Sequence, residues 1–172
     1  MRYRQMGSLD WQVSALGFGA MRLPKSRRFL VKTVDPKEAI ATLRMGIDRG
    51  INYVDTAWPY HLGRGESVVG DALQDGYREK VKLVTKLPTF LVRKTPDFDS
   101  YLNRQLKRLR TDSLDAYLFH SFDRGTFKRA KRLELFDRLE RAREAGKVRH
   151  VGFSFHDTAP VFREIVDHYP WD

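Results

Sequence analysis

The chain contains no cysteine among its 172 residues. Disulfide bonds, a thiol nucleophile and cysteine-ligated iron–sulfur clusters are therefore excluded within it. Long apolar segments are also missing: no run approaches the roughly 20 residues that span a bilayer, and the N-terminus carries no apolar signal segment. We therefore expect a soluble, cytoplasmic protein that does not associate with membranes.

Negative charge is comparatively scarce. The chain has 32 Lys and Arg against 22 Asp and Glu, which gives a net charge of +10. Such an excess occurs in proteins that bind nucleic acid or other anions, and also in proteins whose basic surface has no function. Here the basic residues alternate with apolar positions in helical segments, with Asp and Glu interspersed. This pattern favours solvent-facing helix sides over a surface that binds nucleic acid.

Strand and helix patterns alternate along the chain. Residues 2–13 predict a hairpin that turns at Gly7 and Ser8, and five apolar segments predict strands at residues 15–19, 51–55, 81–86, 114–120 and 148–154. The strands begin about 30 residues or slightly more apart, the length of one strand and one returning helix. Helix patterns fall between them at residues 35–50, 95–109, 135–146 and 160–168. The first opens with an Asp35–Pro36 cap and ends at Gly50.

This alternation limits the fold to a doubly wound sheet or a (β/α) barrel. A doubly wound nucleotide-binding protein carries Gly-x-Gly-x-x-Gly after its first strand, and the segment Gly17–Arg22 lacks that motif. We therefore predict an α/β fold: a partial (β/α)8 TIM barrel made of an N-terminal hairpin and about five β/α units. Trp171 and Asp172 would begin a sixth strand. A closed barrel needs eight, so the single domain, residues 1–172, is expected to be incomplete at its C-terminus.

Four ionisable residues lie at or just beyond the C-terminal ends of consecutive predicted strands: Asp55, Tyr60, Lys86 and His120. In a parallel α/β protein these ends meet at one edge, where active sites form. Taken singly, each residue has an ordinary structural explanation: a turn cap, a packed aromatic ring, an exposed lysine or a core histidine. Their coincidence favours a shared site.

The four groups suit proton donation to a carbonyl oxygen. A tyrosine normally loses its proton near pH 10, and an adjacent ammonium stabilises the phenolate. Lys86 can act in this way on Tyr60, and Asp55 can hold Lys86 in place. The imidazole of His120 can hydrogen-bond a substrate carbonyl and orient it. Such a set complements hydride delivery to the carbonyl carbon from a nicotinamide.

These residues resemble those of the aldo-keto reductases. The segment Gly17–Met21, the Asp-Thr-Ala-x-x-Tyr element that begins at Asp55, the segment Glu66–Gly70, Thr85–Lys86 and the histidine that follows Tyr117–Phe119 match in order. The resemblance implies a (β/α)8 barrel that reduces aldehydes and ketones to alcohols with NADPH or NADH. It also implies that Tyr60 is the proton donor, supported by Lys86, Asp55 and His120.

The resemblance further implies that Gly19, Met21 and Ser154 contact the cofactor. Many family members have Ser-Asn after the fifth strand, whereas Phe155 follows Ser154 here and His156 is a candidate substitute for the Asn. The loops that grip the adenosine phosphate in the family lie beyond Asp172. The sequence around Tyr60–His61, Gly76–Lys80 and Gly152–Asp157 is similar to a branch whose full-length members carry a C-terminal ferredoxin-like iron–sulfur domain, no part of which is present here.

We therefore expect an N-terminal piece of a carbonyl reductase that is weakly active or inactive alone and depends on missing strands for stability. The expected partners are a carbonyl substrate and the nicotinamide cofactor. The alternative is a non-enzymatic basic fragment that binds nucleic acid or a partner protein, which would bind DNA or RNA in a salt-sensitive manner. A barrel hydrolase is disfavoured, because His150 and His156 have no acidic ligand at a recognised spacing, and we expect no metal site.

Overall fold

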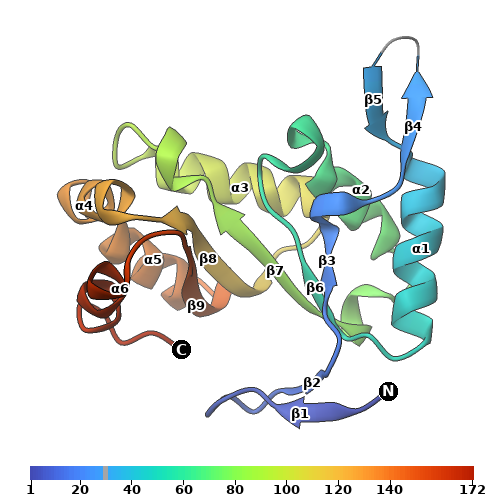
Figure 1. Ribbon diagram of the computed structural model, residues 1–172, viewed down its shortest axis with the longest axis horizontal. Helices are drawn as coiled ribbons and strands as arrows, with labels where there is room; N and C mark the ends of the chain where they lie inside the picture. The colour runs from blue at the N-terminus through green and yellow to red at the C-terminus, as the bar shows by residue number, and fades with distance from the viewer. Residues whose placement is uncertain (29–30) are drawn as a thin grey trace.

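The structure, a computed structural model, describes residues 1–28 and 31–172. A five-stranded parallel sheet in the order β3-β6-β7-β8-β9 forms its centre, and two antiparallel hairpins, β1–β2 and β4–β5, flank it (Figure 1). The strands are β1 (Tyr3–Gln5), β2 (Gln12–Ser14), β3 (Phe18–Gly19), β4 (Lys25–Arg28), β5 (Val31–Val34), β6 (Tyr53–Asp55), β7 (Lys82–Leu87), β8 (Leu114–Phe122) and β9 (Val148–Phe155). The helices are α1 (Pro36–Asp48), α2 (Gly65–Ala72), α3 (Asp97–Leu109), α4 (Arg124–Arg132), α5 (Leu135–Glu144) and α6 (Ala159–Val166).

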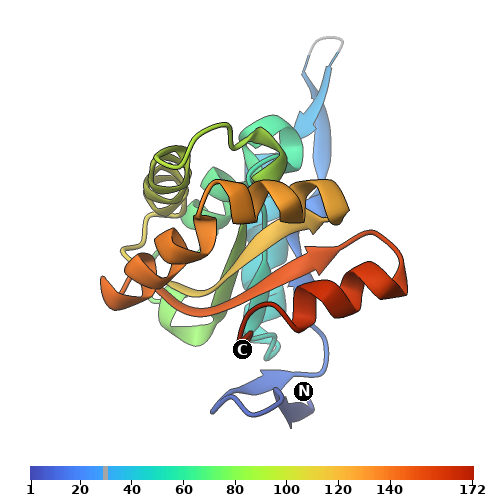
Figure 2. The same ribbon diagram turned by 90° about the vertical axis from the view of Figure 1, so that its left-hand side faces the viewer.

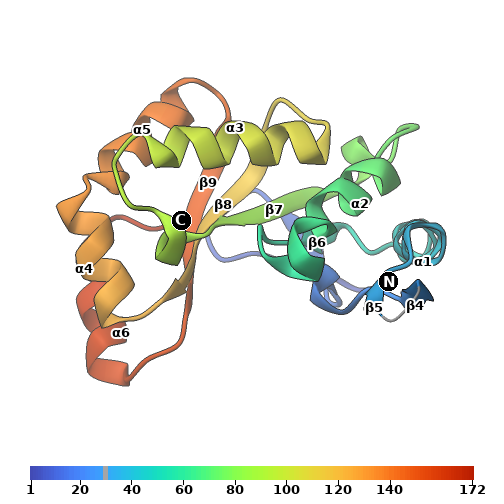
Figure 3. The same cartoon turned by 90° about the horizontal axis from the view of Figure 1, so that it is seen from above.

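This arrangement is a partial (β/α) barrel, as predicted. Seen from above, the strands form an arc with the main helices along its outer side (Figure 3). Local signals begin and end these helices. The carboxylate of Asp35 accepts a hydrogen bond from the Glu38 amide and caps α1, and Gly50, at a φ of +97°, donates its own amide to the Ile47 carbonyl.

Several elements differ from the prediction. Strand β3 is confined to Phe18–Gly19, because the Ala15 amide instead donates to the Arg2 carbonyl, next to the hairpin, and the Ser14 hydroxyl donates to the Leu16 carbonyl.

The structure also contains three elements that the sequence does not predict: the β4–β5 hairpin and helices α2 and α4. Helix α4 has only two buried side chains, Phe127 and Ala130, and is specified mainly by its cap, where Asp123 and Thr126 bond reciprocally. Such a helix has too weak an apolar period to be recognised in a sequence.

The expected sixth strand is not formed at Trp171 and Asp172. One backbone hydrogen bond, from the Asp172 amide to the Val151 carbonyl at 3.4 Å, joins this segment to β9, and a strand ladder needs several consecutive partners. Trp171 instead packs its ring 4.8 Å from that of Phe153, on the helix-facing side of the sheet, and donates its indole N–H to the Ile165 carbonyl. The C-terminal segment returns in this way from α6 to the sheet (Figure 2).

The core has two unequal parts. A large apolar cluster fills the space between the sheet and the helices, and includes Leu83, Phe98 and Phe119. A small second cluster, built on Trp11 and Val84, lies on the inner face of the arc. Trp11 comes from the N-terminal hairpin, which therefore covers the end of the arc opposite to the strands' C-terminal ends. Among the described helices, none combines the length and the apolar character needed to cross a membrane.

Candidate active site

Lys86 is the centre of the site. It lies in β7, one residue before the end of that strand, and is only 5% exposed. Its ammonium donates to the Asp55 carboxylate at 2.6 Å, to the Thr56 carbonyl at 2.9 Å and to the Tyr60 hydroxyl at 3.3 Å. All three acceptors come from β6 or the turn that follows it, because β6 and β7 are parallel neighbours. The structure thus brings together three of the four residues predicted from the sequence in one hydrogen-bonded set.

Burial dominates the electrostatics of Asp55. The pKa of its carboxyl is raised above the ordinary value because removal from water disfavours the charged form, and the Lys86 ammonium offsets part of this effect. Two residues earlier in β6, burial and then the charge of Asp55 raise the pKa of Tyr53 to about 12. Tyr53 therefore stays protonated at neutral pH. The carboxylate of Asp55 forms its ion pair with Lys86.

Tyr60 is held by a tightly wound turn. It begins a 3₁₀ turn, Tyr60–Gly63, in which His61 and Leu62 adopt φ values of 54° and 56°. Left-handed geometry is costly for residues with a side chain, so it persists only where the surroundings enforce it. The His61 Nε2 atom lies 3.3 Å from the Leu23 amide and 3.1 Å from the Ala20 carbonyl, and its tautomer decides which of the two it binds. Either bond ties the Tyr60 turn to the segment that follows β3.

His120 completes the set from β8. Its ring lies 5.9 Å from that of Tyr60, edge to face, and 6.0 Å from that of Phe90. Burial lowers the pKa of its imidazole to about 4, and the nearby ammonium of Lys86 contributes further. His120 is therefore neutral at pH 7. Its Nδ1 atom is buried and has no hydrogen-bond partner among the described residues.

A buried polar network supports Lys86 from the helix side of the sheet. Glu66, on α2 and fully buried, accepts hydrogen bonds from Thr85 at 2.8 Å and Gln105 at 2.5 Å and pairs with Arg108 at 3.2 Å. Gln105 also donates to the main-chain carbonyl of Lys86 at 3.0 Å. Sequence reasoning used Glu66 only as part of a motif and did not identify Gln105, because a polar residue inside a helical apolar stripe shows its role only when its partners are known.

Helices α2 and α3 approach closely beside this network. A Cβ atom at Gly70 would collide with the main-chain carbonyl of Arg108, so only glycine fits there. The close contact of the two helices is what brings Gln105 and Arg108 of α3 within reach of Glu66 on α2. Gly70 therefore has a packing role, which the sequence did not reveal.

The three residues predicted to contact a cofactor lie at the same end of the sheet as the ionisable set. Gly19 pairs in register with Asp55, and a Cβ atom there would meet no atom within 4 Å, so its surface is open. Met21 is 56% exposed. The Ser154 hydroxyl accepts the Ser121 amide at 2.7 Å and can still donate its own proton. All three positions are therefore accessible to a group bound at the C-terminal ends of the strands.

Comparison with known proteins gives a consistent result. The model of the "Aldo/keto reductase family" matches residues 15–170. An uncharacterized oxidoreductase, YqkF of Bacillus subtilis, is 30% identical over 163 residues, which are 90% of this chain and 49% of YqkF. Methylglyoxal reductase YeaE of Escherichia coli is 37% identical over 125 residues, 73% of this chain and 42% of YeaE.

Solved structures agree. The holo form of aldo-keto reductase AKR11C1 from Bacillus halodurans superposes with a TM-score of 0.81 at 27% identity, covering 99% of this chain and 55% of that one. An aldo/keto reductase from Klebsiella pneumoniae, solved with NADP and acetate, gives a TM-score of 0.67 at 28% identity, with 88% and 49% covered. The chain spans about half the length of the relatives that it matches.

Proposed function

This chain belongs to the aldo/keto reductase family, and we propose that it carries the residues that donate the proton in an NAD(P)H-dependent carbonyl reductase. The observation that carries the proposal is the position of the Lys86 ammonium, which bonds both the Asp55 carboxylate and the Tyr60 hydroxyl. A phenol next to a buried ammonium is suited to give up its proton in a reaction that develops negative charge on a neighbouring oxygen.

Each residue has a distinct role in the proposal. Tyr60 donates its hydroxyl proton to the carbonyl oxygen of the substrate, and the phenolate that remains is stabilised by Lys86. Asp55 balances the charge of Lys86 and fixes its position at 2.6 Å. His120 is neutral, since burial lowers its pKa to about 4, and an uncharged imidazole can donate one N–H to the substrate oxygen without competing as an acid.

The cofactor in this proposal is NADPH or NADH, which supplies the hydride that adds to the carbonyl carbon. Gly19, Met21 and Ser154 are proposed to contact its nicotinamide end. The open surface at Gly19 and the exposure of Met21 support this assignment. His156 is the candidate for the position where relatives have Asn, because it follows Ser154 and Phe155 directly after β9.

The chain is proposed to be one domain, residues 1–172, and the N-terminal piece of a longer reductase, because it spans about half the length of its relatives. The similarity to the branch with a ferredoxin-like iron–sulfur domain is part of this proposal and concerns the longer protein. The chain alone is then expected to reduce carbonyls weakly or not at all, because a barrel with five strands lacks part of the wall that surrounds a bound cofactor.

The test combines cofactor binding with turnover. NADPH is titrated into the purified chain while tryptophan fluorescence is followed, since Trp58 lies between Asp55 and Tyr60 in the sequence. Oxidation of NADPH is then measured with a small aldehyde. Tyr60→Phe should bind NADPH normally and lower the rate about a hundredfold or more. Tyr77→Phe, which removes an exposed hydroxyl bonded to Asp48, is the matched control and should change neither quantity.

Three results would count against the proposal. Equal rates in the wild type and Tyr60→Phe would remove Tyr60 as the proton donor. Failure of the chain to bind NADPH would overturn the assignment of Gly19, Met21 and Ser154 as cofactor contacts, whereas slow or absent turnover alone agrees with the low activity expected of five strands. Salt-sensitive binding of DNA or RNA in place of NADPH would favour the non-enzymatic alternative.

A further inference from the structure

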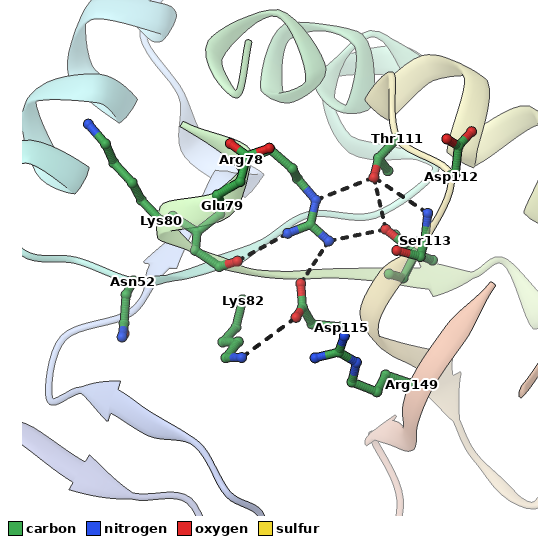
Figure 4. A pocket seen from close by; sticks show the side chains of 12 residues that line it. Asn52, Arg78, Glu79, Lys80, Lys82, Thr111, Asp112, Ser113, Asp115 and Arg149 are labelled. Atoms are coloured by element: carbon green, nitrogen blue, oxygen red, sulfur yellow. Dashed lines mark hydrogen bonds and ion pairs between the residues drawn. The ribbon is translucent and has the colours of Figure 1, made fainter. Parts of the chain in front are cut away.

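A polar hollow of about 550 Å³ lies at the end of the sheet opposite to the Lys86 site. It is lined by residues that precede or begin strands β7, β8 and β9, among them Arg78, Lys82, Asp115 and Arg149 (Figure 4). The catalytic candidates stand at the other ends of these strands. The six residues of β7 alone separate the two ends by roughly 20 Å. The hollow is therefore independent of the proposed reductase site.

Three cations surround one carboxylate in this hollow. Asp115 pairs with Arg78 at 2.8 Å and with Lys82 at 3.8 Å, and accepts the Leu83 amide at 2.9 Å. Arg149 lies opposite Asp115 in the register of β8 and β9, and Figure 4 shows its side chain at the same part of the hollow as Lys82 and Asp115. Asp112 also lines the hollow, but on the far side from Arg149. Around Asp115 one negative charge thus faces three positive ones; over the whole lining, which also includes Lys80 and Glu79, four cations face three acids and leave an excess of one positive charge.

The donors of Arg78 are already used. Its guanidinium donates to the Thr111 hydroxyl at 3.3 Å and to the carbonyls of Val81 and Ser113 at 3.1 Å each, besides its bond to Asp115. This side chain links the segments that precede β7 and β8 and adds positive charge to the hollow. Because its N–H groups already have acceptors, it can give few hydrogen bonds to a ligand. Its role is structural, and it holds Asp115 in place.

Lys82 and Arg149 retain their donors. The ammonium of Lys82, 3.8 Å from Asp115, is too far for a hydrogen bond, and it rests 5.2 Å from the centre of the Trp11 ring. The side chain of Arg149 is exposed and makes no hydrogen bond or ion pair with residues 1–28 or 31–172. A planar guanidinium and an ammonium that converge on a polar hollow match the geometry of oxyanion recognition.

We propose that this hollow binds a small multivalent oxyanion, a phosphate ester or a polycarboxylate, through Arg149 and Lys82. The volume is within the range of sites for small metabolites, and the lining is polar and hydrogen-bonding, which suits an anionic ligand. The argument for more than one anionic group is geometric, because Arg149 and Lys82 are two separate donors on the same hollow. A ligand with two or more anionic groups can bind both side chains at once.

The experiment titrates pyrophosphate, and separately citrate, into the purified chain at low ionic strength. Isothermal calorimetry is the readout, and total tryptophan emission, to which Trp11 beside Lys82 contributes, is a second signal. Saturable binding that weakens with added salt is expected, and the stronger of the two ligands identifies the phosphate or the carboxylate class. Arg149→Gln should weaken binding about tenfold or more, and Lys82→Gln likewise. Arg141→Gln and Lys128→Gln, which remove exposed cations from helices α5 and α4, are the matched controls and should leave affinity unchanged.

Arg149 is exposed, so its substitution should leave the melting temperature of the chain unchanged, and any loss of binding in that variant then reports on the site itself. Equal weakening by Arg141→Gln would mean that the anion responds to net charge only and would overturn the proposal. The proposal fails equally if neither probe saturates, or if Arg149→Gln binds as the wild type does. None of these results depends on NADPH binding or turnover, so they leave the reductase proposal untouched.

Discussion

The ammonium of Lys86 lies 2.6 Å from the carboxylate of Asp55, although the two residues stand 31 positions apart in the sequence. Both groups are largely removed from water, with 6% and 24% of their side chains exposed. A charge in such surroundings depends on its partner, because neither water nor salt screens it well. The stability of the chain and the proposed reaction should therefore both depend on this ion pair.

Removing the cation should leave Asp55 without compensation. In Lys86→Met the pKa of Asp55 rises further above its ordinary value, and the free energy of unfolding at neutral pH falls by about 2 to 4 kcal/mol. The deficit should shrink as the pH falls, since a protonated Asp55 needs no cation. Urea unfolding over a range of pH measures both effects.

The double variant Asp55→Leu with Lys86→Met separates this cause from simple loss of packing. Removing both charges should recover part of the lost stability, because the penalty in the single variant comes from an unpaired buried carboxylate. If the double variant is as unstable as the sum of the two single ones, the pair does not act in this way.

His120 makes stability depend on pH. Its pKa is about 4 in the folded protein, chiefly through burial, against 6.5 for the free side chain. Between these two values the unfolded chain binds more protons than the folded chain, so the contribution of the neutral imidazole is complete above about pH 6.5 and is lost as the pH falls towards 4. His120→Asn should flatten the dependence of the unfolding free energy on pH in this window. Superimposable curves for the two proteins would contradict the assignment, and NMR titration of the imidazole checks it directly.

Glu66 should matter far more for stability than an acidic residue on the surface. Glu66→Ala leaves Thr85 and Gln105 without their acceptor and Arg108 without its partner, so we expect a loss of about 3 kcal/mol in thermal or urea unfolding. Glu66→Gln keeps one acceptor oxygen and should lose less. Glu144→Ala, which alters an exposed acid on α5, is the control. A loss in Glu66→Ala no larger than in the control would rule out the network as a support for Lys86.

The outer edge of β9 should govern the solution state. In the described part of the chain, β9 pairs with β8 on one side, whereas on the other side its only strand-like contacts are with Asp172, whose amide donates to the Val151 carbonyl and whose carboxylate accepts the Val151 amide. An open strand edge tends to pair with another chain. We therefore expect aggregation, instability or dependence on a partner that supplies further strands, measured by size-exclusion chromatography with light scattering. A sharp monomer peak with a cooperative melting transition would show that the edge is tolerated.

Much of the fold could be read from the sequence, because its signals are local. The five strand segments, the N-terminal hairpin and the capped helix α1 follow from apolar period, turn residues and caps, each of which acts within a few positions. Helix α4 and the β4–β5 hairpin were missed for the same reason: their sequences are rich in basic residues, and their formation depends on caps or pairing partners more than on an apolar pattern.

The sequence by itself determined which chemistry the chain can offer, since it places Asp55, Tyr60, Lys86 and His120 at the ends of successive parallel strands. The tertiary structure decided how those groups behave. Burial and neighbours from distant segments set the pKa of His120, make Lys86 the shared donor to Asp55 and Tyr60, and place Glu66 and Gln105 behind it. At the opposite end of the sheet, folding brings Lys82 and Arg149 to one hollow, although they lie far apart in the sequence. In both places the partners of a charged group and its pKa depend on surroundings that the sequence does not display.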